Sequence, residues 1–134
     1  MKLTITIPVH PVSKARPRVV RHGNKTIAYT PSRTVQATME IRSSLLDQKT
    51  TYWFDAGLPL ALNATFYVPK PKSSKKKRFP TTRPDLSGYL ALLLDAMTGY
   101  LYQDDSQVVD IRTRKLYGEP RIEIVLSNEF RVSE

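Results

Sequence analysis

Hydrophobic and polar residues alternate strictly in two segments of the chain, residues 2–9 and 59–68. A period of two is typical of a strand with one buried face, so both segments are predicted strands. The apolar positions are Leu3, Ile5, Ile7, Val9, Leu60, Leu62, Ala64, Phe66 and Val68.

Two hairpins are predicted. In residues 19–29, apolar runs flank a turn that contains Gly23, as in a short β-hairpin. Residues 108–117 and 121–126 also have strand patterns, and the link through Gly118–Pro120 predicts that they form the second hairpin.

Helical patterns fill two longer segments. Pro31 and Ser32 predict the start of a helix that runs to about Lys49. We expect Val35, Met39, Ile41, Leu45 and Leu46 to face inward, and Arg33, Glu40 and Arg42 to face outward.

The second predicted helix covers residues 85–98 and ends at Gly99. Its middle, residues 90–94, is apolar nearly all round, so we expect burial on more than one side.

The order of these elements is strand, hairpin, helix, strand, helix, hairpin. It predicts an α+β fold in which two main helices pack on one face of a mixed, mostly antiparallel sheet. The 134 residues fit a single domain over residues 1–134. No apolar run approaches the ~20 residues that span a bilayer, and the N-terminal alternation is unlike a signal peptide.

Composition narrows the chemistry. The absence of cysteine excludes disulfides, a thiol nucleophile and thiolate metal sites. Two histidines are too few for a histidine-built metal site without carboxylates.

Charge is divided into blocks along the chain, whose formal net charge is +9. Residues 1–39 and 70–83 each carry seven basic groups and no acid, whereas residues 84–111 carry five aspartates and no Lys or Arg. A basic surface beside clustered carboxylates is the combination needed to hold a divalent metal against a phosphate.

The basic positions lie mainly in two predicted loops, one near residues 11–18 and a mobile one at residues 70–83. We expect their side chains to contact DNA phosphates with little reading of the bases. The candidates are Lys14, Arg16, Arg18, Lys70, Lys72, Lys75, Lys76, Lys77, Arg78 and Arg83. Phe79, in the second loop, either anchors the loop to the core or stacks on bases at a branch point.

Four aspartates are candidates for chemistry, and each also has an ordinary explanation. Asp85 is placed to cap a helix, and Asp104 and Asp105 are typical of a turn. Asp95 lies among leucines, where a carboxylate needs a partner, and we expect it to be structural.

The motifs Arg83-Pro-Asp85-Leu-Ser-Gly, Asp95-Ala-Met-Thr-Gly99 and Asp104-Asp-Ser-Gln-Val108 together resemble the RusA family of Holliday junction resolvases. The N-terminal stretch Ile7-Pro-Val-His-Pro-Val-Ser-Lys-Ala-Arg-Pro-Arg18 resembles the phage-type branch of that family.

The resemblance implies a Mg²⁺-dependent endodeoxyribonuclease that acts as a homodimer on four-way junctions or other branched DNA, with Mn²⁺ as a substitute metal. No small-molecule cofactor and no membrane are implied, and the expected location is the cytoplasm of a bacterial or phage-infected cell. The implied catalytic residues are Asp85 and Asp105, with Asp104 assisting, and the implied metal ligands are Asp85, Asp105 and Ser87.

The chain departs from the family pattern at neighbouring positions. Ser87 stands where the family has a second aspartate, Gly88 where it has an asparagine, and Ala91 where it usually has a lysine. These departures leave a second function open: a branched-DNA binding protein with impaired catalysis. A ribosomal-type RNA-binding module would explain the charge but not the acidic motifs.

Overall fold

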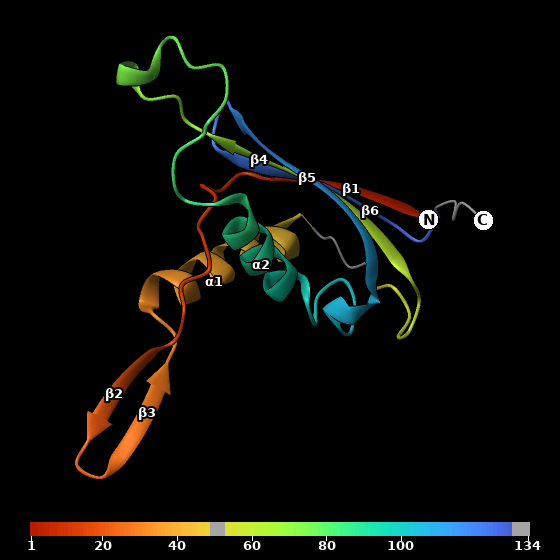
Figure 1. Cartoon of the computed structure of the whole chain (residues 1–134). Helices are drawn as coiled ribbons and strands as arrows, with labels where there is room; N and C mark the ends of the chain where they lie inside the picture. Colours follow the sequence, from red (N-terminus) through yellow and green to blue (C-terminus); the bar gives the residue numbers. More distant parts are fainter. Residues whose placement is uncertain (49–52, 130–134) are drawn as a thin grey trace.

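The computed structural model describes residues 1–48 and 53–129. A sheet of four strands is covered on one face by two helices (Figure 1). The strands are β1 (Lys2–Ile7), β4 (Leu60–Val68), β5 (Val108–Tyr117) and β6 (Arg121–Ser127), and the helices are α1 (Ser32–Asp47) and α2 (Leu86–Met97). This confirms the predicted α+β fold with a mixed sheet.

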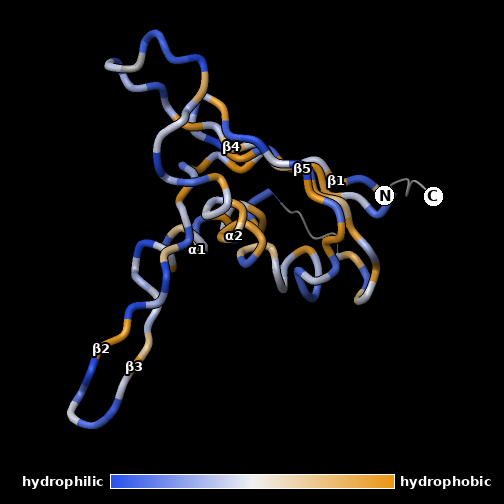
Figure 2. The backbone as a smooth tube through the Cα atoms, viewed as in Figure 1, coloured by the Kyte–Doolittle hydropathy of each residue, from blue (hydrophilic) through white to orange (hydrophobic). Residues whose placement is uncertain are grey.

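The core lies between the sheet and the helices, where Figure 2 shows the hydrophobic positions of both. Alternate residues of the strands point into it, as their period of two predicts. These inward-pointing strand residues pack against one face of each helix. The buried residues include Ile5, Ile7, Leu60, Leu62, Ala64, Phe66, Ile122, Ile124, Leu126, Ile41, Leu45, Tyr89, Leu92, Leu93, Ala96 and Met97.

The strand order is β1-β6-β4-β5, so the predicted hairpin of β5 and β6 is wrong. β4 lies between them, parallel to β5 and antiparallel to β6. The reason is that β4, α2 and β5 form a strand–helix–strand unit, whose helical crossover allows parallel pairing. A strand followed by a helix of 12 residues and another strand was the signal for this unit.

The inward face of α1 differs from the predicted one. Val35, Met39 and Leu46 are 44%, 63% and 61% exposed, whereas Ile41 and Leu45 are buried as expected. The helix is rotated so that the smaller Thr34 and Ala37 are buried instead. The backbone amide of Ala15 donates to Thr34 Oγ1 on this face. The predicted end at Lys49 lies outside the described residues.

Arg42 also differs from its predicted outward position. Its guanidinium donates to the carbonyl oxygens of Asp95 and Ala96, each at 3.0 Å, and lies over the ring of Tyr100. A cation at a helix C-terminus satisfies free carbonyl groups and complements the helix dipole. Arg42 therefore fixes the C-terminal end of α2 to α1.

The predicted hairpin near residues 19–29 is confirmed as β2 (Arg18–His22) and β3 (Lys25–Tyr29). We call this hairpin the arm, because it projects away from the rest of the chain (Figure 1). All of its strand residues are exposed.

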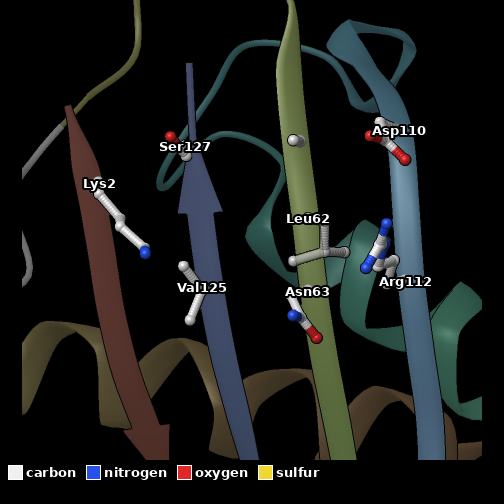
Figure 3. Close-up of a pocket in the computed structure, with 8 residues that line it drawn as sticks. Lys2, Leu62, Asn63, Asp110, Arg112, Val125 and Ser127 are labelled. Atoms are coloured by element: carbon white, nitrogen blue, oxygen red, sulfur yellow. The ribbon is translucent and has the colours of Figure 1, made fainter. Parts of the chain in front are cut away.

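The face of the sheet opposite the helices is open and polar. Figure 3 shows a shallow pocket on it, with Lys2, Asn63, Asp110 and Arg112 in front of the strands and the helices behind. No candidate catalytic residue lines this pocket. Within the described residues, no helix is long and apolar enough to cross a membrane.

Candidate active site

Asp85 directly precedes α2, but its side chain does not cap the helix. Its backbone carbonyl accepts from the amide of Gly88 at 3.1 Å, which closes the first turn. The carboxylate is exposed, so it is free to meet a ligand.

A pocket surrounds this helix start. Three basic residues, Lys14, Arg16 and Arg83, line it together with Asp85 and Ser87. A carboxylate and a hydroxyl beside basic residues form a surface suited to a phosphate group and a bound cation.

The segment before Asp85 is held by β5. The ammonium group of Lys115 donates to the carbonyl oxygens of Thr82 and Pro84, each at 2.9 Å. Sequence analysis missed Lys115, because the parallel pairing that brings β5 beside α2 was not predicted. Lys115 therefore fixes the backbone of the residues that directly precede Asp85.

Residues 11–16 cross α2, and we call this segment the strap. The amide of Lys14 donates to the carbonyl of Gly88 at 3.0 Å, and the amide of Ala15 donates to Thr34 Oγ1 at 3.1 Å. The strap is therefore attached to both helices, although its basic sequence resembled an open loop.

Lys14 reaches along α2 to its other end. Its Nζ lies 2.6 Å from Oδ2 of Asp95, whose side chain is 46% exposed. Asp95 thus has the partner that sequence analysis required, but on the outer face of the helix. Because ten residues separate Asp85 from Asp95, the two lie about 15 Å apart along the helix axis.

The loop of Asp104 and Asp105 packs beside the C-terminal end of α2. Asp104 caps the short helix η2 (Asp105–Gln107), where its Oδ1 accepts from the amide of Ser106 at 3.0 Å. Gln107 is buried and donates to the carbonyl oxygens of Asp55 and Leu58. This network makes the loop a fixed part of the structure.

The two neighbouring carboxyls have opposite electrostatic environments. Hydrogen bonds from Ser106 lower the pKa of Asp104 below its ordinary value. Burial, followed by the proximity of Asp104 and the charge of Asp95, raises the pKa of Asp105, while Lys14 lowers it. Asp104 therefore caps the turn through its hydrogen bonds, whereas Asp105 holds its proton more tightly than a free aspartate does.

Tyr102, which sequence analysis did not single out, joins these parts. Its hydroxyl donates to the carbonyl of Leu94 at 2.8 Å, so the loop is tied to α2. Burial, together with the charges of Asp105, Asp95 and Asp104, raises its pKa well above its usual range. The same three charges act on one hydroxyl because the fold gathers these carboxylates around it.

The arrangement of the acidic side chains bears on the predicted metal site. Among the described residues, no group of three or more His, Cys, Asp and Glu side chains is placed to hold a metal ion. Mg²⁺ is usually held by one or two carboxylates together with water and substrate phosphates. Asp85 and Ser87 lie at the start of α2, whereas Asp105 lies beside its C-terminal end, so the structure does not bring these three predicted ligands together around one ion.

The remaining basic candidates are exposed. Those at residues 70–83 form a loop beyond the end of β4 that includes the short helix η1 (Lys72–Ser74) (Figure 1). Lys70 donates to the carbonyl of Lys75 at 3.0 Å and lies over the ring of Tyr117. Phe79 is 54% exposed, so its side chain does not anchor the loop in the core.

These features define a class: a basic α+β protein with carboxylates and cations gathered along one helix, as a phosphodiester-processing protein requires. The profile of the family described as endodeoxyribonuclease RusA matches residues 8–127. The chain therefore belongs to the RusA endodeoxyribonuclease family, as its motifs predicted.

Two curated relatives are similar to parts of the chain. A Bacillus subtilis (strain 168) protein, "Uncharacterized protein YqaN", is 40% identical over 80 residues, which cover 51% of this chain and 56% of that protein. The "Crossover junction endodeoxyribonuclease rusA" of Lactococcus phage r1t is 33% identical over 89 residues, which cover 65% of this chain and 68% of that one.

Proposed function

We propose that this protein is a structure-selective endodeoxyribonuclease that hydrolyses a phosphodiester bond in four-way junctions or related branched DNA. The observation that carries the proposal is the exposed carboxylate of Asp85, which makes no capping hydrogen bond and lies in a pocket lined by three basic residues. The name of the phage relative, a crossover junction endodeoxyribonuclease, indicates the same substrate class.

Each side chain has a role in this proposal. We assign metal binding to Asp85, with Ser87 as a weak neutral ligand, and to Asp105 at the other end of α2, with Asp104 supporting the loop. Bound Mg²⁺, or Mn²⁺ in its place, would polarise the phosphate and lower the pKa of a water molecule. Arg16 and Arg83 orient the phosphate in the pocket, because guanidinium groups match its geometry.

Recognition of the DNA is assigned to the exposed basic residues. The strap, the base of the arm and the loop at residues 70–83 present positive charge without a nearby acid in sequence, which favours backbone contacts over base reading. A homodimer would match the two-fold symmetry of a four-way junction. We propose that this activity takes place in the cytoplasm of a bacterial or phage-infected cell.

A second function is favoured by a specific observation. The described residues lack a cluster of three acidic or histidine ligands, and Ser87 supplies a hydroxyl where the family has a carboxylate. A protein that binds branched DNA with weak or no metal chemistry is therefore the alternative.

The test uses a labelled immobile four-way junction and a matched linear duplex, each with Mg²⁺, Mn²⁺ or EDTA. Symmetric, metal-dependent nicks in the junction alone are the expected result. Asp105→Asn should remove them, whereas the matched control Asp110→Asn, on the open sheet face, should not. A junction-selective shift without product would support the binding protein instead.

A further inference from the structure

We propose that Lys14 is a catalytic cation of the active site: its ammonium group contacts the phosphate that is cut and stabilises the negative charge that develops there. This inference rests on the proposed nuclease function and deepens it. It also moves Lys14 from the DNA-tracking residues, where sequence analysis placed it, into the reaction itself.

The backbone of Lys14 is fixed from both sides. Its own amide is bonded to Gly88 on α2, and the next amide is bonded to Thr34 on α1. A side chain on such a segment starts from a defined position, as a catalytic group requires. The exposed lysines at residues 75–77 belong instead to a loop in which the carbonyl of Lys75 accepts from Lys70 of the same loop.

The close approach of the strap depends on Gly88. A Cβ atom at this position would lie 1.9 Å from Ser13 Oγ and 3.1 Å from Ser13 Cβ. Glycine is a poor helix former, so its presence within α2 is explained by this contact rather than by helix stability. Gly88 therefore admits the strap that carries Lys14.

Lys14 lies between the two ends of α2. The residue lines the pocket that contains Asp85 and Ser87, and its Nζ pairs with Asp95, near the second group of carboxylates. Ala91 lies one turn before Asp95 on the same helix face, and its small side chain leaves room for the ammonium group of Lys14.

The ion pair with Asp95 contributes little to stability, because both side chains are nearly half exposed. The same exposure allows a phosphate to reach the ammonium group. During hydrolysis, the oxygen of a water molecule bonds to phosphorus and the bond to the leaving oxygen breaks. The proton that the water loses is balanced by the one that the leaving oxygen gains. Lys14 keeps its proton and donates hydrogen bonds to a non-bridging oxygen, where the charge increases.

The experiment measures single-turnover cleavage of the junction and, separately, junction affinity without metal. Lys14→Gln should lower the cleavage rate about 100-fold, the effect of removing one donor from a developing oxyanion. Affinity should change by less than about threefold, because one of many phosphate contacts is lost. The matched control is Lys2→Gln on the open sheet face, which should leave both quantities unchanged.

Two further variants separate catalysis from structure. Lys14→Gln combined with Ala91→Lys should recover most of the lost rate, because a lysine there starts one turn from Asp95. Gly88→Gln keeps Lys14 but places a Cβ atom against Ser13 and displaces the strap, so it should lower the rate although the lysine is still present.

The outcomes are distinguishable. If the wild-type protein binds the junction but does not cut it, the proposed nuclease function fails, and the catalytic role of Lys14 with it. If the wild-type protein cuts and Lys14→Gln cuts equally well, only the role of Lys14 fails. A rate loss that follows the affinity loss, or a double variant without recovery, would also overturn that role.

Discussion

The strap and the arm follow each other in the chain and are both basic, yet the fold treats them differently. The strap is bonded to both helices and its lysine is paired with Asp95. The arm carries Arg18, Arg21 and Lys25, and all of its strand residues are exposed.

This difference shows that a basic run does not define a role by itself. The strap is fixed because oxygen atoms of Gly88 and Thr34 accept hydrogen bonds from its backbone amides. The arm has no such neighbours, and an isolated two-stranded hairpin is only marginally stable in water. A fixed segment suits chemistry, where position matters, and an open one suits contact with a partner such as DNA.

The largest expected effect is at the fixed site. Asp105→Asn should reduce cleavage about 1,000-fold or more, because it removes a metal-binding charge. Junction binding should persist or tighten, since a negative charge near phosphate is lost. Cleavage assays and gel shifts on the same preparation would check this, and surviving cleavage would contradict the metal assignment.

Shortening the arm tests the open segment. Replacing residues 19–28 with a short Gly-Ser link should weaken junction binding about tenfold or more, because two cationic side chains are lost. The melting temperature should change by less than about 2 °C, since no buried residue is removed. A large fall in melting temperature would mean that the arm is part of the folded body after all.

Ser87→Asp tests the pocket at the start of α2. A carboxylate here restores a ligand beside Asp85 and should raise Mg²⁺-dependent cleavage by about tenfold at low metal concentration. The measurement is the cleavage rate across a magnesium titration. An unchanged curve would show that residue 87 does not contact the metal.

The exposed loop at residues 70–83 can be tested through the salt dependence of DNA binding. Neutralising Lys75, Lys76 and Lys77 to Gln should reduce the slope of log affinity against log salt by up to about 2.7. Cleavage at saturating protein should stay within about twofold, because these exposed residues are outside the pocket. An unaltered slope would place the DNA path elsewhere.

The smallest effect concerns stability. Burial and neighbouring carboxylates raise the pKa of Asp105, so the folded protein binds this proton more tightly than the unfolded chain does. The ionised group therefore costs stability at neutral pH, and that cost disappears as the pH falls through the raised pKa. Asp105→Asn should unfold at slightly higher temperature than wild type at pH 7 but not at pH 3.

Much of the fold was predictable because it depends on local periodicity. The helix around Leu92 and Leu93 and the strand around Leu62 and Phe66 follow directly from their apolar patterns. The pairing of β5 was not predictable from its own residues, because the choice between a hairpin and a helical crossover depends on what packs beneath β4.

The candidate site was predictable to a similar extent. The motifs identified Asp85 and Asp105 by their resemblance to a family. The difference between Asp104 and Asp105 required the hydrogen bonds of the turn, and the attachment of Lys14 required contacts between residues more than 70 positions apart.

The sequence by itself determined the elements, the charge blocks and the family, since these depend on residue types at short spacings. Only the tertiary structure decided which carboxyl caps the turn, which face of α1 is buried and where Lys14 points. These features depend on packing between distant segments: the missing side chain of Gly88 matters because Ser13 lies against it.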